Sequence, residues 1–309
     1  MIARRGMTLA EVMIAIVLIG IVGAMFTKML VAQGRFFNAQ YGQRSARSVS
    51  RAPMNFLLSE LRMVQDRDGV DAAQADGKRV RLKVPYRFGV ICGTAGDAMV
   101  ASMLPVDSAV SATYAGWAWR AVDGSYTEVV ATAPLGADSV RDVTGLAGEA
   151  TCTAARIHKP IVNTERGGAK TGRVLELRPA SATGEQAATP GEATAALTIS
   201  PVYLWQYVAY EFKASAAYPG RIGLYRIQAD GTPAAQELEL MAPFDTSARF
   251  KFFVPGRDTS QVAVPATLAT IRGLELVLNG AAGASGSGGS APAVNRLTTA
   301  VFFKNVRTF

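Results

Sequence analysis

The chain begins with a long apolar segment that is bounded by basic residues and interrupted by one acid. From Met7 to Thr27 the only charged residue is Glu11, while Arg4 and Arg5 precede the segment and Lys28 follows it. At about 1.5 Å per residue, a helix over this segment covers the roughly 30 Å hydrocarbon core of a bilayer. The pattern therefore predicts a transmembrane helix. The basic pair places the N-terminus in the cytoplasm and everything after Lys28 outside it.

A second pattern, with one apolar stripe, continues the helix beyond Lys28. Apolar residues recur at steps of three or four residues or their sums, with arginines between them. The apolar set is Phe37, Tyr41, Val49, Ala52 and Phe56, and the polar set is Arg35, Gln40, Arg44, Arg47 and Arg51. Pro53 is expected to kink the helix or to start a second one, after which Leu57, Leu61 and Val64 resume the stripe. We expect an amphipathic extension over residues 28–66 that packs on a sheet.

Alternation of apolar and polar residues then predicts β-strands. Val80, Leu82 and Val84 alternate with Arg79, Arg81 and Lys83, which is typical of a strand with one buried face. Further strand-like runs are 86–91, 117–122, 126–132, 173–177, 197–200, 203–212, 221–227, 237–241, 250–254, 271–278 and 297–303. The runs 203–212 and 221–227 predict a β-hairpin. No second long helix is indicated, so the expected fold class is α+β, a long N-terminal helix packed on a mainly antiparallel sheet.

The β-rich body is expected to cover residues 79–309. Residues 93–170 are long enough to form an insertion or a small subdomain, and their pattern assigns no fold to it. Two stretches of small residues, 180–195 and 280–293, predict exposed loops rather than domain linkers, because strand-like sequence resumes after each.

Glu11 is the informative residue of the apolar segment. A carboxylate in an apolar helix costs up to about 2.5–3.5 kcal/mol at the bilayer centre and less near the interface, so it needs a use or a partner. The chain offers no cation between Arg5 and Lys28. If the chain were cut after Gly6, however, the new α-ammonium of Met7 would lie one helical turn from Glu11, on its own helix or on a neighbour's.

The residues Arg4-Arg5-Gly6, Met7-Thr8-Leu9-Ala10-Glu11 and the apolar run resemble the N-terminal signal of type IV prepilins and type II secretion pseudopilins. In that family a Gly precedes an N-methylated Phe or Met, and Glu is the fifth residue after the cut, as Glu11 is after Gly6. The resemblance implies cleavage between Gly6 and Met7 by a prepilin peptidase and methylation of the Met7 amine. It also implies that Glu11 supports assembly of the helix into a filament core. Met7 in place of the commoner Phe is a mild departure.

The resemblance also extends, more loosely, beyond the apolar segment. Arg44-Ser45-Ala46-Arg47, Met54, Leu57 and Glu60-Leu61-Arg62 are similar to the helix end of large minor pilins and J-type minor pseudopilins. The strand runs at 210–212, 223–226, 271–278 and 298–305 are similar to that subgroup's body. The size of the chain favours a minor subunit, with the filament tip as its candidate position.

The N-terminus has two other interpretations, an ordinary secretory signal and a plain membrane anchor. An ordinary secretory signal also has a basic region and an apolar region, but its small-residue cleavage site follows the apolar region. Residues Met25-Phe26-Thr27-Lys28 offer no convincing site of that kind, and an ordinary signal has no reason to keep an acid at Glu11. A plain membrane anchor is the other alternative.

The composition suits a globular body with an anchor. The chain has 309 residues, 49% of them hydrophobic and 18% charged, and a net charge of +8 that includes Arg4 and Arg5. Basic residues are scattered, and the densest cluster, 78–83, alternates with apolar residues as an exposed strand face does. We therefore interpret the basic residues as solvated surface, and nucleic-acid binding is disfavoured.

Only two cysteines occur, Cys92 and Cys152, both in the part expected outside the cytoplasm. In an oxidising compartment a lone pair favours a disulfide over a metal site. Such a bridge would close a loop of about 60 residues and stabilise the body by a few kcal/mol.

The remaining inventory predicts no catalytic site, no metal site and no cofactor. His158 is the sole histidine and lies in a polar stretch, so multi-histidine zinc sites are excluded. The glycine-rich run 283–289 lacks a P-loop lysine, and Asp66–Asp71 lacks the downstream acid of a calcium loop. The alternating aromatics Trp117, Trp119, Tyr203, Trp205 and Tyr207 favour packing over a ligand platform.

The sequence thus predicts a structural minor pilin or pseudopilin that is not an enzyme. The expected partners are prepilin peptidase, other pilin or pseudopilin subunits, an inner-membrane assembly platform and the bilayer. The expected location is the inner membrane, with the body in the periplasm, and then the filament. The alternatives are a tip adhesin or DNA receptor and, less favoured, a membrane-tethered hydrolase.

Overall fold

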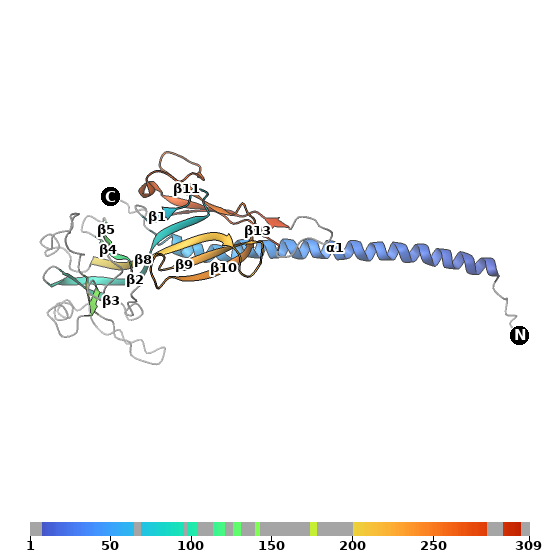
Figure 1. Ribbon diagram of the computed structural model, residues 1–309, viewed down its shortest axis with the longest axis horizontal. Coiled ribbons are helices and arrows are strands. Elements are labelled where there is room, and N and C mark those ends of the chain that lie inside the picture. The colour runs from blue at the N-terminus through green and yellow to red at the C-terminus, as the bar shows by residue number, and fades with distance from the viewer. Residues whose placement is uncertain are drawn as a thin grey trace.

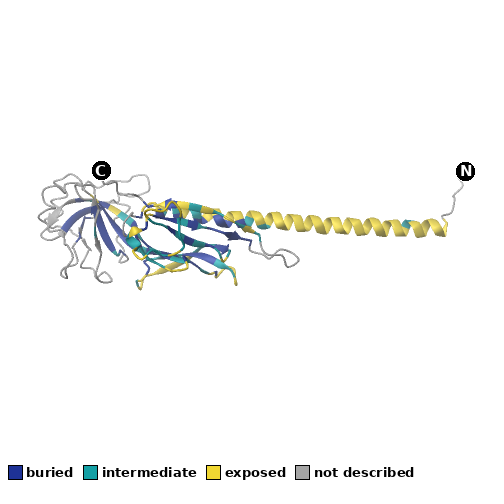
Figure 2. Cartoon of the chain, turned by 90° about the horizontal axis from the view of Figure 1, so that it is seen from above, coloured by how far each residue is buried: buried dark blue, intermediate teal, exposed yellow. Residues whose placement is uncertain are grey.

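A long helix projects from one end of a β-rich body in the computed structural model of the chain (Figure 1). The structure describes residues 8–64, 69–95, 98–103, 114–120, 126–130, 140–142, 174–177, 200–282 and 293–303. The helix, α1, runs from Leu9 to Leu61, about 80 Å at 1.5 Å per residue. Its second half lies along the body, and its first half extends away from it (Figures 1 and 2). The α+β prediction is confirmed.

The strands that follow form two antiparallel sheets. Their bounds are β1 Val70–Ala73, β2 Arg79–Ala95, β3 Ala98–Met103, β4 Gly116–Arg120, β5 Tyr126–Val130, β6 Val140–Asp142, β7 Val174–Leu177, β8 Ser200–Ala214, β9 Ile222–Gln228, β10 Gln236–Phe244, β11 Arg249–Phe253, β12 Gly273–Val277, β13 Gly280–Ala281, β14 Val294–Asn295 and β15 Thr298–Phe302, with a 3-10 turn at Leu268–Thr270. The larger sheet has the order β14-β13-β10-β9-β8-β2-β3-β7-β6, with β1 on β2 and β4 between β5 and β8. The smaller sheet is β11-β12-β15. The predicted hairpin is confirmed as β8–β9.

One predicted pair of strand runs is in fact a single long strand. The runs at 80–84 and 86–91 both belong to β2, and the run at 203–212 lies within β8. Of the run at 197–200, only Ser200 lies among the described residues, where it begins β8. A register shift between Pro85 and Arg87 marks the break in the pattern, because a bulge changes which face each side chain occupies. β2 and β8 are neighbours at the centre of the larger sheet.

The two long strands carry two successive hydrophobic cores. The core near α1 is enclosed by the helix and both sheets, and includes Leu57, Leu61, Leu82, Tyr210 and Phe250. The core at the far end lies among β2, β3, β4, β7 and β8, and contains Ile91, Met103, Trp117, Leu177 and Leu204. The described strands of residues 93–170 therefore add to the larger sheet and build its distal core.

The helix face that packs on the body differs from the predicted one. Val49 is buried as expected, but Phe37 and Tyr41 are 68% and 77% exposed, and Ala52 and Phe56 are also exposed. The buried residues of α1 are Ala46, Val49, Ser50, Pro53, Leu57 and Leu61. Small side chains contribute little to a hydrophobic pattern, yet they let the helix approach the sheet closely.

The end of the helix also differs from the prediction. A single helix passes through Pro53, so no second helix starts after Ala52, and it ends at Leu61 rather than near Asp66. Pro53 is buried against the body, and this packing compensates for the hydrogen bond that proline cannot donate.

Gly280 is a point of close approach between the sheet and α1. A Cβ added to Gly280 would lie 2.3 Å from the Ala46 carbonyl oxygen and 2.9 Å from the Ser50 nitrogen. Beside it, Asn295 Nδ2 donates to Ser50 Oγ at 2.7 Å, and Ser50 Oγ donates to the Ala46 carbonyl at 2.8 Å. The prediction of an exposed loop over 280–293 is therefore wrong for its first residues, because residues 280–282 are buried against the helix.

Replacing Gly280 with alanine is expected to lower the free energy of unfolding by about 1–3 kcal/mol, because the helix backbone must move away from β13. Thermal unfolding of the detergent-solubilised full chain measures the loss. Gly34→Ala is the matched control, since an added Cβ at Gly34 meets nothing within 4 Å. A Gly280→Ala chain as stable as the control would contradict the close contact.

Candidate functional site

The carboxylate of Glu11 lies at the very start of α1 and caps it. Thr8 is the N-cap residue, and its nitrogen and Oγ1 donate to Glu11 Oε2 at 2.9 and 3.1 Å. The Glu11 nitrogen donates in return to Thr8 Oγ1 at 3.4 Å. This is a reciprocal capping box, which satisfies two of the orphan donors at the helix start.

The capping box gives Glu11 a local partner, Thr8, that is not a cation. The spacing Thr8-x-x-Glu11 is the sequence signature of this motif and was available to find it. Both bonds reach Oε2, so among the described residues nothing donates to Oε1. The Glu11 carboxylate thus keeps capacity for a further donor. Gly6 and Met7 lie outside the described residues.

The helix that follows Glu11 is a bare apolar surface. Large side chains from Leu9, 81% exposed, to Val31, 49% exposed, touch no other part of the described structure. Figure 2 shows the exposed colour along nearly all of this part of α1, in contrast to the buried strands. Within the described residues, α1 is the one helix long and apolar enough to cross a membrane.

Residues 1–27 match a family model described as the prokaryotic N-terminal methylation motif. The chain carries a prepilin signal. This prepilin signal is that of type IV pilins and pseudopilins, and it supports a pilin-like subunit that is processed by prepilin peptidase and assembles with other pilin subunits. The apolar helix behind it is compatible with a single-pass inner-membrane anchor. Neither the curated proteins nor the solved structures gave a match.

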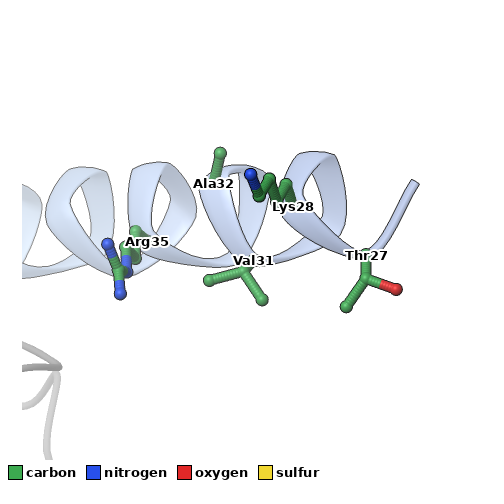
Figure 3. Close-up of a pocket in the computed structure, with 5 residues that line it drawn as sticks. All are labelled: Thr27, Lys28, Val31, Ala32 and Arg35. Carbon is green, nitrogen blue, oxygen red and sulfur yellow. The ribbon is translucent and has the colours of Figure 1, made fainter. Parts of the chain in front are cut away.

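A shallow hollow lies on the surface of α1 where the prepilin signal and the apolar run end. Its lining is Thr27, Lys28, Val31, Ala32 and Arg35, all from α1 (Figure 3). The five residues come from three successive turns of the one helix. This hollow is open helix surface with two basic side chains on it, and it has no enclosing wall that would hold a small molecule.

A buried charge cluster at the other end of α1 was not predicted. Glu60 accepts from Arg226 Nη2 at 2.7 Å and Nε at 3.2 Å, and the Tyr210 hydroxyl also donates to Glu60. The ion-paired side chains of Glu60 and Arg226 are only 13% and 15% exposed. Burial, followed by the neighbouring Glu60, raises the pKa of Tyr210 well above its usual value, so its hydroxyl stays a donor. This cluster attaches the helix to β8 and β9.

The basic strand face is neutralised within the molecule. Arg79 pairs with Asp230 at 2.9 Å, Arg81 pairs with Asp71, and Lys83 pairs with Glu128 at 2.6 Å. Arg81 also lies over the Tyr207 ring at 4.7 Å, and Lys83 over Trp205 at 5.1 Å. Cations that are paired in this way are poorly available to phosphates, which argues against a nucleic-acid interface here.

The aromatic residues serve packing, as predicted. Trp117, Trp119 and Trp205 are at most 4% exposed, and Trp205 packs edge-on against Tyr207 with ring centroids 5.3 Å apart. Asp71, from the run that lacks the downstream acid of a calcium loop, pairs with Arg81, and no cluster of metal-ligating residues occurs in the part of the chain that the structure describes. The Cys92 side chain, Cys152 and His158 lie outside the described residues, so the disulfide stays a prediction.

Proposed function

We propose that this chain is a structural minor pilin or pseudopilin that acts by assembly. Prepilin peptidase removes residues 1–6 by cutting between Gly6 and Met7, and the Met7 amine is methylated. Residues 7–27 hold the subunit in the inner membrane with its N-terminus cytoplasmic, residues 28–61 carry the body, and the β-rich body lies in the periplasm. An inner-membrane assembly platform then transfers the apolar helix from lipid into a filament core.

The observation that carries this proposal is the Glu11 carboxylate within a prepilin signal, followed by an apolar helix that no other described part of the chain covers. In a filament core the Met7 ammonium of a neighbouring subunit supplies the further donor to Glu11. Because each charge would be costly alone in an apolar surrounding, the pair favours one axial position of the helix over others. The size of the body favours a minor subunit near the filament tip.

Replacing Glu11 with glutamine is expected to leave processing and membrane retention intact but to reduce incorporation into filaments at least about tenfold. Glutamine at N3 keeps the capping box but removes the charge that pairs with the ammonium. Immunoblots of sheared filaments against whole membranes measure the ratio.

Thr8→Ala is the matched control for this experiment. It removes the capping hydroxyl, at a cost of about 1 kcal/mol, and keeps the Glu11 charge. We expect it to incorporate far better than Glu11→Gln. If Glu11→Gln entered filaments as well as the unaltered chain, Glu11 would be only a helix cap and the pairing role would be wrong.

A further inference from the structure

The charges along α1 are strongly one-sided. Between Glu11 and Glu60 the helix has no acidic residue, but it carries Lys28, Arg35, Arg44, Arg47 and Arg51. No ion pair forms between any of these five cations and an acid within the described residues. A helix with this excess of one charge needs an anion from outside its own fold when it is packed in an assembly.

Three of the arginines lie on the side of α1 that faces away from the body. Arg44, Arg47 and Arg51 follow the three- and four-residue spacing of one helix face and are all exposed. Phe37 and Tyr41 precede Arg44 by seven and three residues and share this face. We call these five residues the outer face.

The body covers the opposite side of the helix. Ala46, Pro53 and Leu57, which are buried against the sheets, lie about half a turn from the outer face at 100° per residue. No part of the body that the structure describes covers the outer face, so this face is open to another molecule. Its combination of exposed aromatic rings and arginines is typical of protein interfaces.

Lipid headgroups do not reach the outer-face arginines. With Lys28 at the membrane surface, Arg44 and Arg51 lie about 24 and 35 Å further along the helix. The headgroup region is only about 5–8 Å thick on each side of the bilayer, and charges are screened over about 8 Å at physiological salt. Lys28 and Arg35 are close enough to meet anionic lipids, whereas Arg44, Arg47 and Arg51 are not.

The helix of a second copy of this chain also supplies no matching charge. A parallel helix of the same sequence brings arginines to arginines, because it has no acid over the same stretch. Six of the acids described in the body already pair with cations of their own fold: Asp71, Glu128, Glu211, Asp230, Glu237 and Glu275. Like charges held side by side disfavour that contact.

We propose that the outer face of α1 is an interface for a different subunit that presents acidic side chains to Arg44, Arg47 and Arg51. The chain then enters its filament beside an acidic neighbour and does not form a filament of its own copies. This inference rests on the proposed assembly function and adds to it the chemistry of the neighbouring subunit.

The variant R44E/R47E/R51E of the full chain serves as an acidic helix of known geometry. Full-length chains with a fluorescent donor or acceptor fused at the C-terminus are reconstituted in phosphatidylcholine vesicles, and energy transfer reports their association. We expect the unaltered chain to associate with this variant about tenfold more strongly than with itself, since each of three exposed ion pairs contributes up to a fewfold change. The preference should decrease between 50 mM and 500 mM salt.

The matched control carries the same change of charge elsewhere on the surface. Arg257, Arg272 and Arg296 are all exposed and lie on the body, so R257E/R272E/R296E should give no preferred pairing with the unaltered chain. Equal association of all combinations would overturn the proposal, as would strong pairing of the unaltered chain with itself. Binding of duplex DNA by the unaltered chain that is lost in R44E/R47E/R51E would instead make the face a nucleic-acid site and overturn it too.

In the host, R44E/R47E/R51E should be cleaved and retained in the membrane but at least about tenfold depleted from filaments, while the control triple variant is incorporated. Undiminished incorporation would overturn the proposed interface. N-terminal sequencing of the same samples separates the two proposals. Normal cleavage with unchanged assembly contradicts only the interface, whereas an uncleaved chain contradicts the proposed function.

Discussion

Replacing Gly6 with leucine is expected to leave essentially all of the chain uncleaved and absent from filaments. A residue without a Cβ allows a protease to approach the peptide bond after it closely, and a branched side chain at this position blocks that approach. The uncleaved chain keeps Arg4 and Arg5 and has no ammonium at Met7. Mobility on a gel and the mass of the N-terminal peptide measure the processed fraction.

Gly34→Leu is the control for this experiment, because Gly34 lies in open helix surface outside the prepilin signal and should leave cleavage unchanged. Gly6→Leu and Glu11→Gln should share the assembly defect and differ in processing, since one removes the ammonium and the other removes the carboxylate. A mature N-terminus at Met7 in the Gly6→Leu chain would contradict the assigned cleavage site. Six retained residues in the unaltered chain, with the peptidase present, would contradict the whole assembly proposal.

Replacing Glu60 with alanine is expected to lower the free energy of unfolding by about 3–5 kcal/mol, because it leaves the Arg226 guanidinium buried without its carboxylate. Burial acts to lower the pKa of Arg226, but Glu60 and Tyr210 outweigh it and raise the pKa, so Arg226 stays charged. The Tyr210 hydroxyl loses its acceptor as well. Thermal and denaturant unfolding of the full chain in detergent measure the loss.

Two further variants make the Glu60 prediction specific. Glu237→Ala breaks the Lys213–Glu237 pair, whose side chains are 34% and 43% exposed, and should cost less than about 1 kcal/mol. The double variant E60L/R226M removes both buried charges and should recover much of the stability lost in Glu60→Ala. If Glu60→Ala cost no more than Glu237→Ala, the cluster would not be what attaches the helix to the sheet.

The sequence by itself determined the class of the fold and the part of the chain that carries the prepilin signal. A long unbroken apolar run predicts a helix, and alternation of apolar and polar residues predicts a strand. The helix from Leu9 and most strands could therefore be predicted directly. The Thr8–Glu11 capping box was also readable, since its two residues are only three apart.

Only the tertiary structure decided which side of α1 meets the body. Large side chains such as Phe37 and Tyr41 dominate a hydrophobic pattern, but the fit of Ala46 and Ser50 against Gly280 determined the packed face. Likewise Glu60 and Arg226 are separated by 166 residues, so no local pattern joins them. Such contacts depend on how whole elements are brought together, and the physical reason is that close packing and ion pairing act between surfaces that meet only after folding.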